Sequence, residues 1–312
     1  FCTSMERLLI TLILVCTMSN ITNAQNPFYG QYHTPHGTVP FDRIETEHYE
    51  PAILEGIKLQ NAEIEAIIQN PEKADFSNTI EAFEASGELL DKVVAVFGNM
   101  LSAETNDDLQ ELAQKIMPLL SEHSNNITLN EKLFARVKEV YNQKETLQLT
   151  QEQKQLLENA YNSFVRHGAN LEGEAREEYR RLTNELSKLT LTFSENNLKE
   201  TNAYQMLLTK KESLAGLPEI IIEAAAETAK SEEKEGWAFT LHAPSYVPFM
   251  TYSDNRDLRQ KLYMAYNTKC THDNEFNNID IVKNIANTRM KIAQLLGYKD
   301  YAEYTLKKRM AE

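Results

Sequence analysis

Glycine and proline are scarce in this sequence, with 10 and 9 copies among 312 residues. A β-sandwich or a β-barrel needs many tight turns, and tight turns rely on these two residue types. Their scarcity argues against an all-β fold and favours long helices. The expected fold class is therefore mainly α.

Cysteine is also rare. The three copies are Cys2, Cys16 and Cys270, and the first two lie in or before an expected leader. Only Cys270 remains after processing, so no intrachain disulfide can form in the mature part of this chain. A protein that is exported without disulfides must rely on its apolar core for stability.

A helical zinc-peptidase site is missing from these 312 residues. Such a site needs two histidines four residues apart, with a glutamate directly after the first as general base. No two histidines here have that spacing and none is followed by glutamate: His33, His36, His48, His123, His167, His242 and His272. The chain also lacks a glycine-rich phosphate loop and a Gly-x-Ser-x-Gly motif. We therefore assign no catalytic, cofactor-binding or metal-binding residue to it.

Two weaker groupings of metal-ligating residue types do occur. His33 and His36 lie three residues apart, in a segment with proline and glycine that offers no rigid geometry. Cys270 and His272, with Glu275 nearby, could form a soft metal site or simply a polar loop between two helices. A structural zinc ion normally takes four closed ligands, so the loop is the favoured interpretation.

The charge balance is acidic, with a formal net charge of −14 and 42% hydrophobic residues. This composition is ordinary for a globular protein of one large or two small cores. An acidic surface repels the phosphate backbone, so nucleic acid is not expected as a partner.

The N-terminal end has the features of a signal peptide. The sequence does not begin with methionine, and Met5 is a candidate start. The apolar run Leu8–Val15 is too short to span a bilayer, so no stable membrane insertion is expected. Thr22-Asn23-Ala24 has small residues at −3 and −1, which predicts cleavage before Gln25. Residues 1–24 thus predict an exported, periplasmic protein; the alternative is a buried N-terminal strand or helix.

Residues 25–45 predict an extended arm that is held by its aromatic rings, because prolines and aromatics alternate there. Helices are expected after it. Thr46 is the expected cap of the first, and Asn78 with Glu81 forms a capping-box pattern that opens the second. The expected helical ranges are 46–69, 78–100, 107–122, 130–143, 151–166, 172–199, 254–267, 279–296 and 300–312.

The range 172–199 carries the clearest periodicity. Its apolar residues recur every 3.5 positions, as in two packed antiparallel helices: Ala175, Tyr179, Leu182, Leu186, Leu189 and Phe193. Beyond it, residues 203–209 and 237–242 predict two strands of a small sheet, and the alanine run in 219–230 favours a helix between them. The expectation is thus a helical protein with a small β-sheet insert.

The C-terminal segment Asp300–Glu312 is expected to be helical up to the last residue. No glycine, asparagine or proline closes it. We therefore interpret the chain as a piece of a longer protein.

Short motifs follow one another along almost the whole chain after the leader. They are Asn26-Pro27-Phe28, Tyr32, Thr34-Pro35, Pro40-Phe41, Ile44, His48-Tyr49, Pro51-Ala52, Phe76, Asn78-Thr79-Ile80-Glu81-Ala82, Phe164-Val165-Arg166, Gly168-Ala169, Leu214-Ala215-Gly216-Leu217-Pro218, Asn255-Arg256, Leu258-Arg259, Leu295-Leu296-Gly297-Tyr298, Tyr301-Ala302 and Met310-Ala311. In this order they resemble the thimet oligopeptidase family of zinc metallopeptidases, family M3. The opening is similar to the bacterial peptidyl-dipeptidase branch.

The resemblance implies a helical body split by a deep channel, with the N-terminal half forming much of one channel wall. Residues 46–312 would be that helical part, ending before the zinc motif. The resemblance also implies one Zn²⁺ per full-length enzyme, bound by a His-Glu-x-x-His helix and a further glutamate beyond residue 312. The implied partners are short peptides, from which C-terminal dipeptides are released, and the default state is a monomer.

Two other functions stay open at this point. One is an endo-acting oligopeptidase of the same family, although the aromatic and proline-rich arm at residues 26–41 favours the dipeptidase. The other is a non-catalytic helical binding or scaffold protein of the cell envelope. In every case the 312-residue chain by itself is expected to be inactive, because it carries no zinc motif.

Overall fold

A computed structural model describes residues 26–310, and helices of all types account for 71% of them. This confirms the mainly helical fold class. The expected leader and the cleavage site before Gln25 lie outside the described residues. The chain divides into two compact units: unit 1 comprises described residues 26–184 and 295–297, and unit 2 comprises 185–294 and 298–310.

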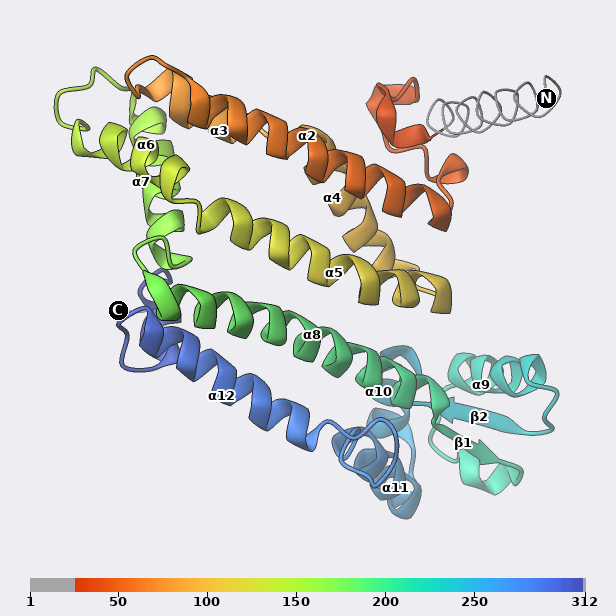
Figure 1. Ribbon diagram of the computed structural model, residues 1–312. Helices are drawn as coiled ribbons and strands as arrows, with labels where there is room; N and C mark the ends of the chain where they lie inside the picture. The colour runs from red at the N-terminus through yellow and green to blue at the C-terminus, as the bar shows by residue number, and fades with distance from the viewer. Residues whose placement is uncertain (1–25, 311–312) are drawn as a thin grey trace, which may run out of the picture. The chain divides into compact units, whose positions relative to one another are not determined.

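Unit 1 is built from helices in the part of the chain that the structure describes (Figure 1). Helix α2 packs along α4 and also contacts α5 and α6. The elements are η1 (Pro27–Tyr29), η2 (Pro35–Gly37), η3 (Phe41–Arg43), η4 (Thr46–His48), α2 (Tyr49–Gln69), η5 (Phe76–Glu81), α3 (Ala82–Glu84), α4 (Glu88–Ala103), α5 (Asp107–Thr128), α6 (Glu131–Asn142), α7 (Gln151–Arg166) and the first part of α8 (Gly173–Ala203).

Polar side chains at the N-caps set where several of these helices begin. The Thr150 hydroxyl accepts a hydrogen bond from the Gln153 N–H at 3.2 Å, and the Gln153 side chain accepts from the Thr150 N–H at 3.0 Å. Asn130 caps α6 in the same way, by accepting from the Leu133 N–H at 3.0 Å. Such caps satisfy backbone donors that have no partner within the helix. The helices expected over 130–143 and 151–166 are confirmed.

The single helix expected over 78–100 is wrong. The Asp75 carboxylate accepts from the Asn78 N–H at 2.7 Å, and the Asn78 side chain accepts from the Asp75 N–H at 3.1 Å, so the chain enters the helix three residues earlier. The helix then ends at α3, and Gly87 adopts a φ of +84° before α4 begins. Glycine reaches this left-handed region at little cost, which makes the break possible.

The arm was expected to be extended over 25–45, and the structure corrects this. Three short 3₁₀ turns, η1 to η3, make up much of the segment. Phe28 is fully buried and its ring lies 5.4 Å from that of Tyr49, which in turn lies 5.2 Å from Phe97. Phe41, by contrast, is 50% exposed. The aromatic attachment of the arm is therefore confirmed at Phe28 and wrong at Phe41.

The first long helix also begins differently from the expectation. Thr46 is not its cap; Glu45 and His48 form the reciprocal cap of the turn η4, which leads directly into α2. The end of α2 at Gln69 agrees with the prediction. The expected helix 107–122 is real but extends to Thr128 as α5.

Unit 1 has one main apolar cluster, which α2, η5, α6 and α7 enclose. Its buried members are Ile64, Ile67, Ala74, Phe76, Ile80, Ile127, Leu133, Phe134, Val137, Val140, Leu157, Ala160, Phe164 and Ala169. Rings of Phe134 and Phe164 stack at 5.8 Å in its centre. The cluster therefore joins two stretches of the chain, residues 64–80 and 127–169.

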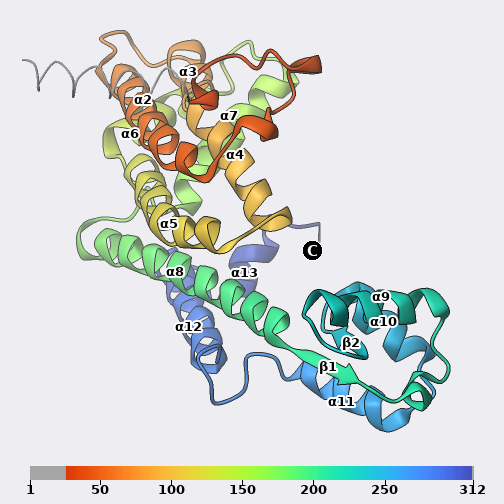
Figure 2. The same ribbon diagram turned by 90° about the vertical axis from the view of Figure 1, so that its right-hand side faces the viewer.

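Unit 2 surrounds the one sheet found among the described residues. Strand β1 (Gln205–Leu208) pairs antiparallel with β2 (Trp237–Thr240), with Met206 opposite Phe239. Figure 2 shows α9 (Glu219–Ser231) and α10 (Ala243–Tyr252) close to β2, and both helices contact it. The remaining elements are the last part of α8, η6 (Lys211–Leu214), α11 (Arg256–Asn267), α12 (Ile279–Leu295, whose last residue falls in unit 1) and α13 (Tyr301–Leu306). The small sheet and the helix between its strands are confirmed.

Two features of unit 2 differ from the expectations. Helix α10 was not predicted at all. The last helix, α13, begins after its cap Asp300, which accepts from the Glu303 N–H at 2.9 Å, and it ends at Leu306. A helix that continues to residue 312 was therefore the wrong prediction. None of the helices within residues 26–310 is both long and apolar enough to cross a membrane.

The apolar seam of α8 is buried unevenly. Tyr179 and Leu182, which lie in unit 1, are almost completely buried. Leu186 and Leu189, in unit 2, are half-buried, and Phe193 is 38% exposed. The seam is therefore a packing surface at its first half and an incompletely covered one at its second.

Candidate functional site

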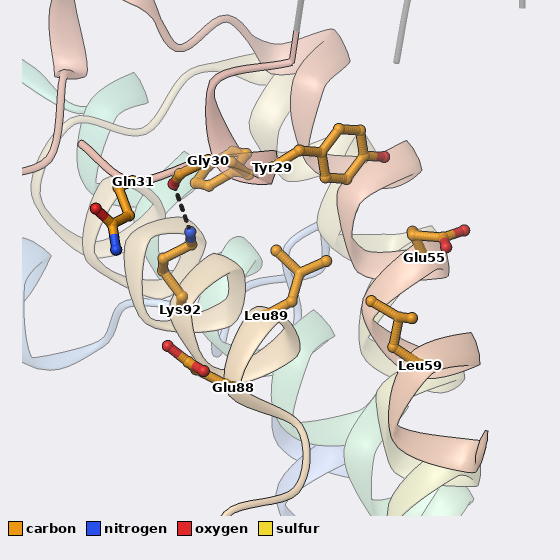
Figure 3. Close-up of a pocket in the computed structure, with 9 residues that line it drawn as sticks. Tyr29, Gly30, Gln31, Glu55, Leu59, Glu88, Leu89 and Lys92 are labelled. Carbon is orange, nitrogen blue, oxygen red and sulfur yellow. Dashed lines mark hydrogen bonds between the residues drawn. The ribbon is translucent and has the colours of Figure 1, made fainter. Parts of the chain in front are cut away.

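A groove of about 560 Å³ lies in unit 1 where the arm crosses α2 and α4. Figure 3 shows Glu55 and Leu59 on α2 at one side, Leu89 and Lys92 on α4 at the other, and Tyr29 above them. Residues four apart on a helix share a face, which is why Glu55 and Leu59 both line the groove. We call this the arm groove; its lining residues are Phe28, Tyr29, Gly30, Gln31, Glu55, Leu59, Glu88, Leu89 and Lys92.

The charged groups of the arm groove are partly engaged already. Lys92 Nζ donates to the Gly30 carbonyl oxygen at 3.3 Å and lies 4.9 Å from the centre of the Tyr32 ring. Glu55 is paired with Lys58 at 2.9 Å. Burial, and then the carboxylate of Glu55, raise the pKa of Tyr29, so that its phenol stays protonated at neutral pH. The groove is suited to binding an apolar or amphipathic group rather than to proton transfer.

A second groove of about 580 Å³ lies between the start of α2 and the start of α5. Its floor is formed by Pro51, Leu54 and Leu112, and Leu54 is 47% exposed. Its rim carries four carboxylates and one ammonium group: Glu47, Glu50, Asp108, Glu111 and Lys115. The rim is therefore acidic, as is the chain as a whole.

The two weak metal groupings do not come together as sites. His33 and His36 are both exposed, and His36 has a φ of 59° within the turn η2. Cys270 is buried, whereas His272 and Glu275 on the same loop are exposed. The loop interpretation of residues 270–275 agrees with this arrangement.

The environment of Cys270 makes its thiol unreactive. Its backbone N–H donates to Glu200, at the end of α8, and its carbonyl accepts from the Asn278 N–H at 2.8 Å. Burial, followed by the hydrogen bond and the negative charge of Glu200, raises the pKa of the thiol to about 11. Metal binding and nucleophilic attack both need the thiolate, which is a minor form at that pKa.

His123 is the buried histidine of unit 1. Its Nε2 lies 2.7 Å from Gln60 Oε1, and Gln60 Nε2 donates to the Ser86 carbonyl at 3.4 Å. Burial lowers the pKa of His123, because the surroundings offer no water to solvate an imidazolium. This histidine joins α5 to α2 and to the turn before α4, so its role is structural.

Within residues 26–310 no group of three or more histidine, cysteine, aspartate or glutamate side chains is arranged to hold a metal ion. A catalytic zinc ion needs three protein ligands that converge on one point. The described residues therefore do not fit the zinc ion that the family resemblance implies.

The sequence did not reveal the arm groove. Glu88 and Lys92 stand four residues apart on α4, as Glu55 and Leu59 do on α2, and this spacing is visible in the sequence. It becomes informative only when α2 is known to pack against α4. Glu200, the partner of Cys270, lies 70 positions away and had no local signal either.

Comparison with known proteins gives consistent relationships. Residues 249–312 match the family described as Peptidase family M3. The chain is 35% identical, over 92% of its length, to dipeptidyl carboxypeptidase of Escherichia coli K12, and 34% identical to dipeptidyl carboxypeptidase of Salmonella typhimurium LT2 over the same share. It is 30% identical to oligopeptidase A of Salmonella typhimurium LT2, again over 92%. Each match covers 42% of the relative, so the chain spans about two fifths of the length of these proteins.

Proposed function

We propose that this chain, which belongs to peptidase family M3, is the N-terminal part of an exported zinc peptidase that hydrolyses short peptides. The observation that carries the proposal is the relationship over 92% of the chain to a dipeptidyl carboxypeptidase at 35% identity. The helical fold and the mixed apolar and acidic grooves of unit 1 are compatible with a surface that faces peptides.

The finer activity that we propose is release of dipeptides from the C-terminus of the substrate. The two dipeptidyl carboxypeptidases are 35% and 34% identical to the chain, against 30% for oligopeptidase A of Salmonella typhimurium. The difference is small. An oligopeptidase that cleaves within short peptides is therefore the second candidate, and the product pattern distinguishes the two.

The zinc ion is proposed to bind to polypeptide outside these 312 residues. When bound, zinc polarises the scissile carbonyl and lowers the pKa of a water molecule. The residues of this chain supply none of that chemistry. Their proposed part is to bind and orient the peptide and to support the region that holds the metal.

A paired assay tests the proposal. The 312-residue chain and the longer protein encoded by the complete gene are purified, and zinc is measured by mass spectrometry. We expect the longer protein to bind zinc and to release C-terminal dipeptides from short N-blocked peptides, with loss of activity in a chelator. The chain alone should do neither, because it has no ligand set.

Three results would change the proposal. Chelator-sensitive turnover by the 312-residue chain would show that the active site lies within it. Internal cleavage by the longer protein would favour the oligopeptidase. A longer protein that binds peptides without cleaving them would favour the scaffold interpretation. Export is tested separately, by intact-mass measurement of protein from the periplasm, which should begin at Gln25.

A further inference from the structure

Exposed large apolar side chains are distributed unequally between the two units. Four belong to the described part of unit 1 and thirteen to that of unit 2, although unit 2 is the smaller. Those of unit 1 are Phe41, Leu54, Leu59 and Leu119. Those of unit 2 are Phe193, Leu207, Ile220, Val247, Tyr252, Tyr263, Met264, Tyr266, Ile279, Val282, Met290, Leu306 and Met310. Large apolar patches on a protein surface commonly mark interaction sites.

Helix α12, which Figure 1 labels, carries part of this excess in a regular pattern. One stripe of the helix, at positions 281, 285, 288 and 292, faces the interior of the protein, and Ile285, Thr288 and Ile292 are buried there. A second apolar stripe follows the spacing 3, 4 and 4 along the same helix. It consists of Ile279, Val282, Ala286 and Met290, and all four are exposed.

The second stripe lies between the buried stripe and the polar face of α12. At about 100° per residue, its four residues lie within a sector of about 80°, and Ala293, which lies in the same sector near the end of the helix, is buried. The polar face adjoins the stripe on its other side and carries Asp280, Lys283, Asn284, Asn287, Lys291 and Gln294, all exposed. A helix at a solvated surface shows one apolar face; α12 has an apolar surface wider than the part that unit 2 covers.

The position of α12 in the family indicates what covers this stripe. Residues 249–312, which include the whole helix, match peptidase family M3. The relatives are much longer than this chain, which spans 42% of their length. The spacings of 3, 4 and 4 residues average about 3.7, close to one helical turn, so the stripe runs along the helix as a surface on which another helix can pack. Three of its four residues are exposed by 43–49%, enough to accommodate such a partner.

We infer that the stripe Ile279, Val282, Ala286 and Met290 is the docking surface for an apolar-faced helix from the remaining polypeptide of the peptidase. This inference rests on the proposed function, because it assumes that the chain is part of a longer M3 peptidase. The occupant is a segment of the same polypeptide, not a second copy of the chain. The stripe thereby joins unit 2 to the region that is proposed to bind zinc.

Cysteine labelling tests the inference directly. Val282→Cys, in the stripe, and Asn287→Cys, on the polar face, are introduced separately into the 312-residue chain and into the longer protein. Reaction with a maleimide is followed at each position by peptide mass mapping. We expect labelling at position 282 to slow by about tenfold or more in the longer protein, and labelling at 287 to change by less than about twofold.

Stability measurements provide a second readout. Val282→Glu should lower the melting temperature of the longer protein by about 4 °C or more, because a charge would be buried at the contact. The same substitution should leave the 312-residue chain unchanged. Asn287→Glu should have little effect on either.

The outcomes separate the inference from the proposed function. Equal labelling at position 282 in both proteins would overturn the inference even if the longer protein is an active peptidase. Protection at 282 in a longer protein without activity would support it while the proposed function fails. Protection in the 312-residue chain, accompanied by a dimer in light scattering, would overturn it by identifying a second copy as the occupant.

Discussion

Units 1 and 2 of this chain are both mainly helical, but they bury their apolar residues to different degrees. In unit 1, fourteen buried residues from positions 64–80 and 127–169 form one apolar cluster. Unit 2 packs nine around a two-stranded sheet and leaves most of the exposed large apolar side chains of the described chain on its surface. Unit 2 thus leaves more large apolar side chains uncovered than unit 1 does.

The difference shows which unit has more uncovered apolar surface for contact with other polypeptide. The grooves described above lie in unit 1. The match to peptidase family M3 falls at 249–312, mostly in unit 2. The segment matched by the family model thus lies mostly in the unit with more uncovered apolar surface, although the similarity to the relatives extends over 92% of the chain.

The largest expected effect comes from deleting a core ring in one unit at a time. Phe249 and Phe164 are both almost fully buried, in units 2 and 1 respectively. Phe249→Ala and Phe164→Ala should each lower the free energy of unfolding by about 3–5 kcal/mol. Trp237, the single tryptophan, lies in β2 of unit 2, so its fluorescence reports that unit alone.

The comparison between the units predicts different readouts for these two variants. In urea titrations, Phe249→Ala should shift the Trp237 fluorescence midpoint, and Phe164→Ala should shift only the part of the far-UV circular dichroism that unit 1 contributes. If Phe164→Ala shifts the fluorescence midpoint equally, the two units unfold as one and the comparison fails.

A smaller effect is expected at the contact between α2 and α4 in unit 1. A Cβ atom at Gly56 would lie 2.9 Å from Leu90 Cα, whereas one at Gly98 would meet nothing within 4 Å. Gly56→Ala should therefore destabilise unit 1 by about 1–3 kcal/mol through overpacking. Gly98→Ala, the matched control, should stabilise it by about 0.5–1 kcal/mol, because alanine favours the helix. Circular dichroism in urea measures both, and opposite signs are the expected result.

Acidification should weaken unit 1 through His123. Burial lowers the pKa of this histidine in the folded state, so below the ordinary value near 6.5 the unfolded chain takes up a proton that the folded one does not. This contribution to stability is present above pH 6.5 and is lost as the pH falls through the lowered pKa. The slope cannot exceed about 1.4 kcal/mol per pH unit for one proton. His123→Gln should flatten it in circular dichroism, while the Trp237 fluorescence midpoint keeps its pH dependence.

The smallest effect concerns the reactivity of Cys270 in unit 2. Because the pKa of its thiol is about 11, only a small fraction is thiolate at pH 8 and alkylation should be much slower than in the unfolded chain. Glu200→Gln removes a charge and should speed the reaction at pH 8 by lowering that pKa. Mass spectrometry of the alkylated protein measures the rate; an unchanged rate in Glu200→Gln would leave burial as the sole cause.

Local signals in the sequence predicted those elements that local interactions determine. The range of α7 was predicted, and the cap Thr150 with Gln153 begins it; β1 and β2 were located because they are short segments bounded by turn residues. The two caps predicted at Thr46 and Asn78 were wrong, because Glu45 and Asp75 take those roles. The sequence did not predict α10, because Pro248 lies inside it and proline normally disfavours a helix interior. Its burial of Phe249 in the core of unit 2 outweighs that preference, and this is a tertiary effect that no short window contains.

The grooves were beyond prediction for a related reason. The arm groove brings Tyr29 next to Glu55 and Leu89, residues that come from three separate elements. Their chemistry is ordinary for exposed positions, so nothing marks them in the sequence. The zinc motif, in contrast, depends on spacing within one helix, and the sequence alone could state that these 312 residues do not contain it.

The order of the two units along the chain has a consequence for biosynthesis. Apart from residues 295–297, unit 1 is one continuous stretch that ends at residue 184. The ribosome therefore synthesises nearly all of unit 1 before it begins unit 2. The 95 residues from position 184 to the start of α12 at position 279 (279 − 184) take about 5–20 seconds to synthesise at roughly 5–20 residues per second. Nearly all residues of unit 1 are therefore available for folding during this interval. The nascent chain would then contain almost all of unit 1 while α12 is still being synthesised. Because most of the exposed large apolar side chains belong to unit 2, a chaperone that binds this protein during synthesis should contact unit 2.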